Sequence, residues 1–425
     1  MSRQMKDSGY SWIGEIPIDW EVRAVKHYYT MQTGFTPDTK KEDYYDDENG
    51  FDWVTIGDLT GDRFIPASTK SHISEFYLQE NNQPIVPRGS LLYSFKLSVG
   101  QVAFADRDVY TNEAIASFIN SDDICLEFLF YSSSMIIENA NENIYGAKLL
   151  NQDLIRNAMI VYPSIDEQKR IAKFLDSQCA HIDAVIEKTK ASIEEYKKLK
   201  QAVITQAVTK GIRGDRPMKD SGIEWIGKIP ADWEIIKIKW LLEEKKDKSE
   251  TGEEEPLSMS QKYGLIPTKE MDMIPNMASS FVGAKLVYEG DLVFNKLKAH
   301  LGVFAVSKYE GLVSPDYAVY YSTGRAEVKF LEYLFKTPQY INEFKKKSSG
   351  VGAGLTRLYT GDLYSIYSAM PNLEEQKEII EYINSRNKEM DKLIAKKEAF
   401  LVELEAYKKS LIYEYVTGKK EVPVS

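Results

Sequence analysis

Cysteine and histidine are scarce in this chain of 425 residues. Its two cysteines, Cys125 and Cys179, provide neither a disulfide framework nor a zinc-binding spacing, and its 4 histidines are scattered. No apolar run reaches the roughly 18 residues that a membrane-spanning helix needs. The first residues are polar and do not resemble a secretory signal. We therefore expect a soluble, cytoplasmic protein that holds no metal.

Sequence motifs of catalysis are also missing. There is no glycine-rich loop of the P-loop or dinucleotide-binding kind, and the glycines within 350–354 precede no obvious helix with a ribose-binding acid. The Asn-Pro-Pro-Tyr type of tetrapeptide that adenine methyltransferases use does not occur. The sequence predicts a binding protein with no catalytic residues and no cofactor of its own.

The charge of the chain is negative and unevenly distributed. The formal net charge is −10, and residues 1–162 alone hold 13 Lys and Arg against 24 Asp and Glu. Such acidity argues against a nucleic-acid partner unless basic side chains gather in a local patch. The few lysines of this acidic region are therefore informative candidates for phosphate contacts.

An internal repeat predicts the architecture. Residues 5–21 and 218–234 are identical at 13 of 17 positions, at an offset of 213. A second pair of similar segments begins at Pro163 and Pro371, at an offset of 208. A repeat of this length indicates the tandem duplication of a whole domain together with the helix that follows it.

Each copy changes its sequence pattern after this proline. Residues 22–162 and 235–370 combine aromatic and β-branched residues with short turn signals, which is typical of mixed α/β domains. Acidic residues follow the prolines, and then come apolar residues spaced by 3, 4 or 7, the pattern of a coiled-coil seam. The predicted seam positions are Ile171, Leu175, Cys179, Ile182, Ile186, Ile193, Tyr196, Val203 and Ala207 in the first copy, and Ile379, Ile383, Met390, Ile394, Leu401, Leu404, Leu411 and Tyr415 in the second.

The predicted fold class is α+β or mixed, with two homologous α/β globular domains, two long antiparallel coiled-coil helices and an internal pseudo-two-fold. We expect a first globular domain at 1–162, a central helix at 163–212, a second globular domain at 213–370 and a C-terminal helix at 371–425. A helix of about 45 residues is roughly 65–70 Å long and overhangs a small domain, so its apolar stripe needs a partner helix. The related second helix is the simplest partner.

In this order of segments the sequence resembles the specificity (S) subunits of type I restriction–modification systems. The resemblance covers nearly the whole chain and is most specific at the two helix openings, Glu167 to Ile171 and Glu375 to Ile379. The duplicated segments Trp12 to Trp20 and Trp225 to Trp233 also carry it. Further similar stretches lie at 33–37, 52–59, 110–114, 290–295 and 311–317.

The resemblance implies that each globular domain is a target recognition domain for one half of a bipartite, asymmetric site in double-stranded DNA. It implies that the paired helices set the spacing and dock two methyltransferase (M) subunits, which bind S-adenosylmethionine and methylate adenine. Motor and nuclease (R) subunits are expected to join this complex for cleavage. The chain itself is then a non-catalytic, DNA-binding scaffold.

Polar and basic residues beside turns are the candidate DNA contacts, because Arg and Lys can pair with guanine or phosphate, and Asn and Gln with adenine. In the first domain these are Thr36, Lys40, Lys41, Ser94, Lys96, Ser98, Tyr145, Lys148 and Asn151. In the second domain they are Ser260, Gln261, Lys262, Tyr263, Lys296, Lys298, His300, Thr356, Arg357 and Tyr359. The repeated tryptophans are expected to be packing anchors, namely Trp12, Trp20, Trp225 and Trp233.

Three alternatives remain open. The chain could serve a related methyltransferase-only or other restriction system. It could be a methyltransferase with fused recognition domains, which the missing motifs oppose. It could be a coiled-coil spacer with two protein-binding domains, which the acidic first domain favours slightly. Salt-dependent DNA binding separates a reader from a spacer, because a spacer releases no DNA counterions.

Overall fold

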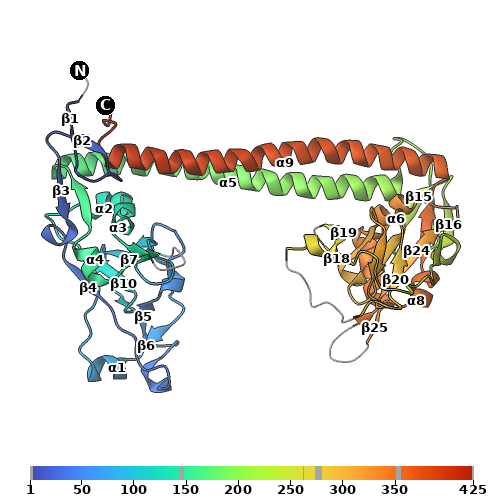
Figure 1. The fold of residues 1–425 in the computed structure, drawn as a ribbon, viewed down its shortest axis with the longest axis horizontal. Helices are drawn as coiled ribbons and strands as arrows, with labels where there is room; N and C mark the ends of the chain where they lie inside the picture. The colour runs from blue at the N-terminus through green and yellow to red at the C-terminus, as the bar shows by residue number, and fades with distance from the viewer. Residues whose placement is uncertain (1–2, 143–147, 262, 273–279, 351–355, 424–425) are drawn as a thin grey trace. The chain divides into compact units, whose positions relative to one another are not determined.

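The computed structural model describes residues 3–142, 148–261, 263–272, 280–350 and 356–423. The chain divides into two compact units, which we call unit 1 (residues 1–189 and 399–425) and unit 2 (residues 190–398). Each unit contains one globular part and one half of each long helix (Figure 1). These compact units divide both long helices, whereas the domain boundaries predicted from the sequence keep each helix whole. The predicted domain boundaries therefore stay a prediction.

Unit 1 is built around a four-stranded antiparallel sheet in the order β4-β10-β7-β8. Helices α2 and α3 pack on this sheet, and Phe128 and Leu129 of α2 share one apolar core with Tyr93 of β7. The bounds are β4 (Met31–Thr33), β7 (Leu91–Ser94), β8 (Val102–Phe104), β10 (Ile115–Phe118), α2 (Leu126–Ser132) and α3 (Ser134–Ile137).

Smaller elements surround this sheet. The three-stranded sheet β6-β5-β9 carries a separate aromatic cluster around Trp53, and strand β13 pairs with β3 at the entrance to the first long helix. The bounds are β1 (Met5–Asp7), β2 (Glu15–Pro17), β3 (Glu21–Ala24), β5 (Phe51–Val54), β6 (His72–Ile73), α1 (Glu75–Glu80), β9 (Tyr110–Thr111), β11 (Asn141–Glu142), β12 (Lys148–Leu149), α4 (Gln152–Arg156) and β13 (Met159–Tyr162).

Unit 2 repeats this plan with a four-stranded antiparallel sheet in the order β17-β24-β21-β22. Phe294 of this sheet stacks on Phe304, and Phe330 and Phe335 of α6 complete the core. The bounds are β17 (Leu242–Glu244), β21 (Leu292–Asn295), β22 (Phe304–Val306), β24 (Tyr317–Ser322), α6 (Val328–Phe335) and α7 (Pro338–Lys347).

The remaining strands of unit 2 form short two-stranded sheets. Their bounds are β14 (Met218–Asp220), β15 (Lys228–Pro230), β16 (Glu234–Lys237), β18 (Leu257–Ser260), β19 (Gly264–Pro267), β20 (Lys285–Val287), β23 (Gly311–Val313), β25 (Ser349–Gly350), β26 (Thr356–Arg357) and β27 (Tyr367–Met370), with helix α8 at Thr360–Ser365. The matching sheets, together with two long helices, confirm the predicted fold class of duplicated α/β domains.

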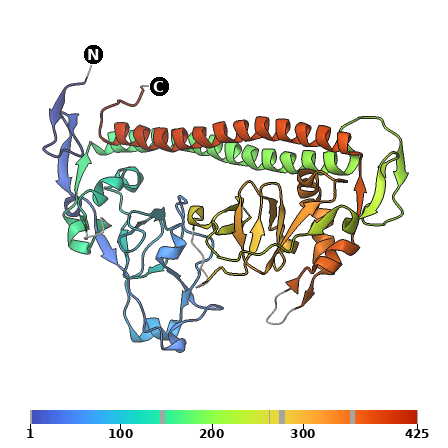
Figure 2. The ribbon, with the colours of Figure 1, turned by 45° about the vertical axis from the view of Figure 1, so that its right-hand side comes forward.

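The two long helices are α5 (Ile165–Lys210) and α9 (Leu373–Val416). Within each unit their segments lie side by side in both ribbon views (Figures 1 and 2). Lys408 Nζ lies 2.6 Å from Asp183 Oδ1 in unit 1, and Lys200 Nζ lies 2.6 Å from Asp391 Oδ1 in unit 2. These pairs fix an antiparallel register, and each pair is the duplicate of the other at an offset of 208.

Burial follows most of the predicted seam. The fully buried seam residues are Ile171, Leu175, Cys179, Ile182, Ile186, Ile193, Ala207, Ile379, Ile383, Met390, Leu411 and Tyr415. The half-buried ones are Tyr196, Val203, Ile394, Leu401 and Leu404. Near the end of α5 the buried positions are Ile204 and Val208 rather than Val203, because this last stretch packs on the core of unit 2.

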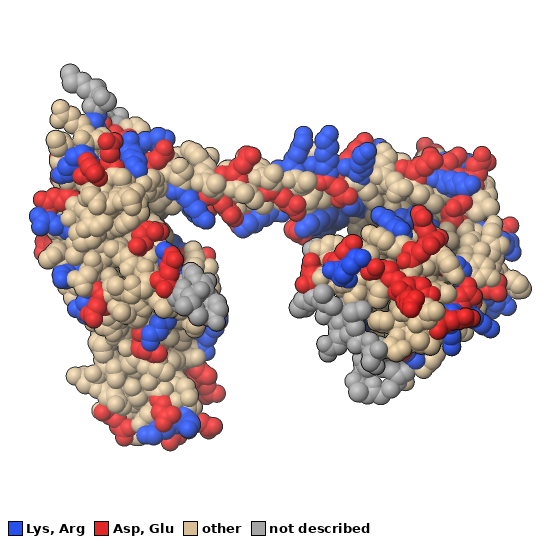
Figure 3. All heavy atoms as spheres, in the orientation of Figure 1, with Lys and Arg blue, Asp and Glu red and all other residues tan. Residues whose placement is uncertain are grey.

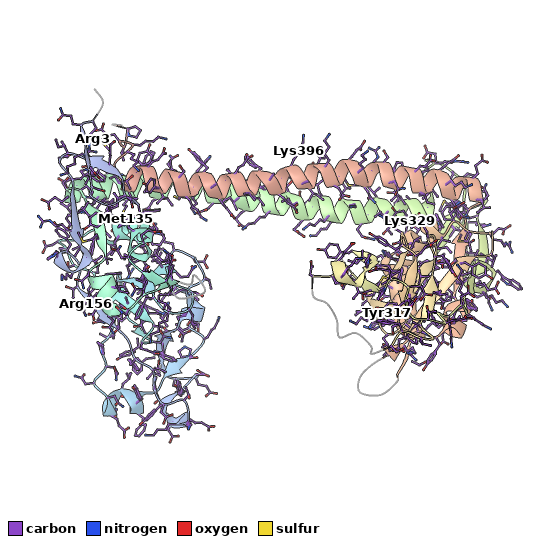
Figure 4. The ribbon with its side chains drawn as sticks, in the orientation of Figure 1. Arg3, Met135, Arg156, Tyr317, Lys329 and Lys396 are labelled. Carbon is purple, nitrogen blue, oxygen red and sulfur yellow. The ribbon has the colours of Figure 1, made fainter. Side chains whose placement is uncertain are left out.

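Each helix opening is fastened by the same three side chains. Trp20, 1% exposed, donates from Nε1 to Glu167 Oε2 at 2.9 Å, and Arg3 pairs with that carboxylate at 2.7 Å and lies over the indole ring. Figure 4 shows Arg3 beside the start of α5. In unit 2 the duplicates are Trp233, Glu375 and Arg216. A packing role thus accounts for Trp20 and Trp233.

A glycine ends each helix against one of these tryptophans. Gly211 (φ +77°) and Gly418 (φ +69°) adopt the left-handed conformation that closes a helix. A Cβ atom on Gly418 would lie 3.0 Å from Trp20 Cη2, and one on Gly211 would lie 3.6 Å from Trp233 Cζ2. The end of α9 therefore closes on the anchor of α5 in unit 1, and the end of α5 closes on the anchor of α9 in unit 2.

Candidate nucleic-acid interface

Three predicted contact segments of unit 2 converge at one edge of its main sheet. Gln261 Nε2 donates to the carbonyl of Leu301 at 2.7 Å, and the Leu358 N–H donates to the carbonyl of Lys296 at 3.0 Å. Thr356 Oγ1 lies 3.5 Å from His300 Nδ1. Residues that lie almost 100 positions apart in the sequence therefore share one surface, which we call the unit 2 edge and define as Ser260, Gln261, Tyr263, Lys296, Lys298, His300, Thr356, Arg357 and Tyr359.

The local turns explain how these side chains are presented. Ser260 Oγ accepts from the Tyr263 N–H at 2.8 Å, which closes the turn between β18 and β19. Lys298 and Tyr359 are exposed, whereas Lys296 is half-buried beside Asn295 at the end of β21. Lys262, also predicted as a contact, lies outside the described residues.

The unit 2 edge carries charges of both signs. Arg357 forms an ion pair with Asp316, and Lys285 Nζ lies 2.9 Å from Glu244 Oε1. Burial, followed by the nearby charge of Lys285, lowers the pKa of Lys296. Next to these groups is a cavity of about 470 Å³, whose polar lining includes Ser258, Thr268, Asn295, Ser314, Asp316 and Tyr317. Tyr317 begins β24 and is labelled in Figure 4.

In unit 1 the predicted contacts are more dispersed. Lys96 lies 3.8 Å from Glu113 Oε1, Lys148 pairs with Glu142 at 2.8 Å, and Lys41 Nζ donates to Tyr44 Oη at 2.7 Å. The exposed contacts of unit 1 are Thr36, Lys40, Lys41, Lys96, Ser98 and Asn151, and Lys148 is half-buried. Asn151 Oδ1 accepts from the Leu154 N–H at 2.8 Å and so caps α4. Tyr145 lies outside the described residues.

Ser94 is a correction to the predicted contacts, because it is fully buried. Its Oγ donates to the carbonyl of Ser98 and accepts from the Gln101 N–H at 3.0 Å. Strand β7 lies between β10 and β8, and all four of its residues are buried. Ser94 therefore shapes the turn that presents its neighbours and does not reach a ligand itself.

The residue at the tip of this turn is not among the predicted contacts. Leu97 is 92% exposed, and its φ of +60° lies in a region that bulky residues rarely adopt. Lys96 and Ser98, both predicted contacts, flank it. An apolar residue between two polar ones in a turn was the available signal, but the unusual backbone conformation becomes visible only in the structure.

A second cluster that sequence spacing did not reveal joins the globular part of unit 1 to α5. Arg63 pairs with both carboxylate oxygens of Asp176, and Tyr131 Oη donates to the same carboxylate at 2.6 Å. The guanidinium of Arg63 also lies over the rings of Phe104 and Phe130, at 5.4 and 5.3 Å. We call Arg63, Tyr131 and Asp176 the unit 1 clamp.

Within the part of the chain that the structure describes, no group of three or more His, Cys, Asp or Glu side chains is arranged to hold a metal ion. None of the described helices combines the length and the apolar character that crossing a membrane requires.

Residues 17–195 match the family of the type I restriction modification DNA specificity domain. A putative type I restriction enzyme MjaX specificity subunit of Methanocaldococcus jannaschii is 26% identical over 430 residues, which cover 96% of each chain. The MjaIX specificity subunit of the same organism is 29% identical over 192 residues, which cover 44% of this chain and 43% of that relative.

Solved structures share the fold. One chain, from a study of complex assembly and conformational transition of the type I R-M system, covers 95% of this chain and 99% of its own length, with a TM-score of 0.70 and 14% identity. The HsdS subunit from Thermoanaerobacter tengcongensis covers 97% of this chain and 100% of its own length, with a TM-score of 0.54 and 15% identity. The predicted resemblance is therefore confirmed: residues 17–195 match the specificity domain, and nearly the whole chain is similar to type I restriction enzyme specificity subunits and shares the fold of the solved structures.

Proposed function

We propose that this chain is the DNA-reading subunit of a type I restriction–modification complex and that each globular part reads one half of a bipartite site in double-stranded DNA. The observation that carries the proposal is the unit 2 edge, where Gln261, Lys298 and Arg357 come together from three distant segments. Amide and guanidinium groups are the side chains that distinguish adenine from guanine in the major groove.

The site read by this chain is asymmetric because the two copies differ where they present these groups. Strands β12 and β26 correspond at an offset of 208, so that Leu149 takes the place of Arg357 and Lys148 that of Thr356. Leu149 is 51% exposed and offers no hydrogen-bond donor from its side chain. Two surfaces of such different chemistry recognise different half-sites.

The paired helices dock two methyltransferase (M) subunits, which bind S-adenosylmethionine and methylate adenine, and R subunits join them for cleavage. The duplicated ion pairs Asp183–Lys408 and Asp391–Lys200 support two equivalent docking surfaces for one kind of partner. The chain itself carries no catalytic group and no cofactor in this assignment.

The surface of α9 in unit 2 supports a protein partner on the helices. Lys388, Lys392 and Lys396 are exposed at intervals of four and form no ion pair with the described residues. Figure 3 shows cationic side chains gathered on this stretch, and in Figure 4 Lys396 points away from the globular part of unit 2. Like charges at this spacing destabilise a helix, and an acidic surface of the M subunit would offset that repulsion.

The decisive experiment compares a base contact with a phosphate contact in the complex with M subunits. Arg357→Ala is expected to relax methylation at one position of one half-site, at a cost of about 1–3 kcal/mol in binding. Lys40→Ala is expected to weaken binding to every sequence alike and to reduce the salt slope by about one. Binding that shows no salt dependence at all would favour the alternative of a protein-binding spacer.

A second experiment tests the spacing role of the helices. Inserting one heptad into residues 188–200 and one into residues 396–408 lengthens each helix by about 10 Å, which corresponds to about three base pairs. The gap between the methylated half-sites is expected to grow while their sequences stay the same. Altered half-site sequences would contradict this division of labour.

A further inference from the structure

The ion pair between Arg357 and Asp316 joins two unequal partners. The Arg357 side chain is 25% exposed, whereas that of Asp316 is 56% exposed. The carboxylate engages only the Nη2 end of the guanidinium, and the buried Nε–H of Arg357 has no hydrogen-bond partner among the described residues. A guanidinium can donate five hydrogen bonds, so Asp316 satisfies only part of this donor group.

The surroundings of this pair are cationic. Lys296 is half-buried, and its side chain has no hydrogen-bond or ion-pair partner in the described part of the chain. The carboxylate of Glu244 is already engaged by Lys285 Nζ at 2.9 Å and by Thr360 Oγ1 at 2.6 Å. Burial is the main reason why the pKa of Lys296 is lowered, and the charges of Lys285 and Arg357 lower it further. Asp316 is therefore the exposed carboxylate that partly neutralises a cluster able to bind an anion.

We propose that Asp316 is an internal competitor that occupies Arg357 in the free protein and is displaced when DNA binds. This proposal rests on the proposed function and adds a regulatory residue to it. A carboxylate and a DNA acceptor, either a phosphate oxygen or the edge of guanine, use the same donors of a guanidinium. An acceptor on DNA must therefore outcompete Asp316 before Arg357 can bind it.

The geometry keeps Arg357 ready for this exchange. Its guanidinium carbon lies 5.9 Å from the ring centre of Tyr359, and the next residue, Leu358, is tied to the carbonyl of Lys296 by a 3.0 Å hydrogen bond. Because the side chain is already oriented, DNA binding costs less side-chain entropy. The charge of Asp316 also repels the phosphates of DNA. DNA of a wrong sequence, which makes too few other contacts to displace Asp316, is therefore bound less well.

The displaced carboxylate can turn toward solvent. Asp316 is 56% exposed at the rim of the cavity of about 470 Å³, whose lining combines polar residues such as Ser258 and Asn295 with apolar ones such as Leu257. The Asp316 N–H is already bonded to Ser314 Oγ at 3.3 Å. Because its side chain is more than half exposed, Asp316 can turn away from Arg357 into water, so the exchange does not require the burial of an unpaired charge.

The test measures binding of the full chain, assembled with its M subunits, to labelled duplexes of several unrelated sequences by fluorescence anisotropy. Asp316→Asn removes the competing charge and keeps the size of the side chain. Ion pairs that are exposed to water are worth up to about 1 kcal/mol. We therefore expect binding to become about three- to tenfold tighter. Equal gains on all duplexes would identify phosphate as the acceptor, and gains on particular sequences would identify a base edge.

Glu289→Gln is the matched control. Glu289 is exposed just before β21, whereas Lys296 follows the other end of that strand. The Glu289→Gln variant removes one negative charge from unit 2, as Asp316→Asn does, and we expect it to change the affinity for DNA very little. In the double variant with Arg357→Ala, the gain from Asp316→Asn should vanish, because the competed donor is gone.

Two results would overturn the proposal, and they are distinguishable. If the wild-type complex binds duplexes with the usual salt dependence but Asp316→Asn matches Glu289→Gln, the competitor role is wrong and the proposed function stands. If the wild-type complex shows no salt-dependent binding to any duplex, the proposed function fails and the competitor role fails with it.

Discussion

The two units hold their long helices with the same contacts, but they expose different side chains at the edges of their sheets. Arg3, Trp20 and Glu167 in unit 1 have the same arrangement as Arg216, Trp233 and Glu375 in unit 2. At the edges of the sheets, by contrast, Leu149 in unit 1 corresponds to Arg357 in unit 2. The duplicated parts thus agree where a helix must be fastened and differ where a ligand would be read.

A second difference concerns how each globular part is held on its long helix. Tyr131 Oη donates to Asp176 at 2.6 Å in unit 1, and the duplicate Tyr333 Oη donates to Asn384 at 2.7 Å in unit 2. Only the carboxylate recruits Arg63, which pairs with it through two nitrogen atoms. Unit 1 therefore has an ionic clamp that depends on both Asp176 and Arg63, whereas the equivalent tyrosine of unit 2 makes a neutral hydrogen bond to an amide.

The largest expected effect comes from separating the copies. A fragment of residues 1–215 keeps all of α5 but loses α9 and the globular part of unit 2, so those parts of the stripe from Ile171 to Ala207 that pack on the lost segments become exposed to water. Burying apolar surface is worth about 25 cal/mol per Å². Helix α5 of a second copy of the fragment can replace the missing α9, because α9 is the duplicate of α5. We expect an antiparallel homodimer that, with M subunits, methylates a palindrome of the first half-site. Sedimentation and methylation mapping check this.

The register of that homodimer follows from the ion pairs. Lys408 corresponds to Lys200 at an offset of 208, so Asp183 should meet Lys200 of the second copy, twice in each dimer. Asp183→Lys should weaken the dimer about tenfold, and adding Lys200→Asp should restore it. A monomeric fragment, or a dimer that still reads the original asymmetric site, would contradict the equivalence of the two copies.

The sequence predicted the parts of the fold that repeat or follow a helical period. It predicted helices at 163–212 and 371–425, and they are observed at Ile165–Lys210 and Leu373–Val416. Spacing along a helix identifies its buried stripe, because residues three and four apart share a face. It did not reveal that Ser94 is buried, because four consecutive buried residues in a central strand show no alternation between a core side and a solvent side.

The candidate site was predictable residue by residue but not as an arrangement. Gln261, Lys298 and Arg357 stood out as polar residues beside turns, whereas their convergence depends on which strands pair. The competitor Asp316 is 41 positions from Arg357, and Arg63 is 113 positions from Asp176. No local pattern in the sequence indicates such partners, because only the folded chain brings these charges together.

The next effect concerns the shared anchors, which differ in burial. The side chains of Glu375 and Arg216 are 1% and 11% exposed, against 13% and 20% for Glu167 and Arg3. The bond to Glu375 is also the main reason why the pKa of Arg216 is raised. Removing one partner of a buried pair is strongly destabilising, so we expect Glu375→Gln to cost about 3 kcal/mol and Glu167→Gln about half of that. Chemical denaturation followed by tryptophan fluorescence measures both, and equal losses would contradict the role of burial.

A smaller effect is expected from converting the unit 1 clamp into its unit 2 counterpart. Asp176→Asn keeps the acceptor for Tyr131 but removes the charge that holds Arg63. The two charged side chains are about one-third exposed, so we expect a loss of about 1 kcal/mol in the stability of unit 1. The reverse change in unit 2, Asn384→Asp, serves as the control and should add no comparable stability. Denaturant titrations give the change in the free energy of unfolding for both variants. Losses of the same size in Asp176→Asn and Asn384→Asp would show that Arg63 contributes nothing.

The smallest effect sharpens the comparison at the loop tips. Leu97 holds a φ of +60° in the turn between β7 and β8 of unit 1, which also contains Gly100 at +91°, whereas the corresponding turn of unit 2, between β21 and β22, has Gly302 at +75°. A left-handed conformation costs a bulky residue about 1 kcal/mol, so Leu97→Gly should raise the stability of unit 1 by about 0.5–1 kcal/mol. If Leu97 touches a thymine methyl group or a base step, the same variant should bind cognate DNA a few-fold more weakly. Asn tolerates the left-handed region and lacks the apolar contact, so Leu97→Asn should reproduce both changes. Greater stability with unchanged DNA affinity would leave the exposed leucine without a part in reading the first half-site.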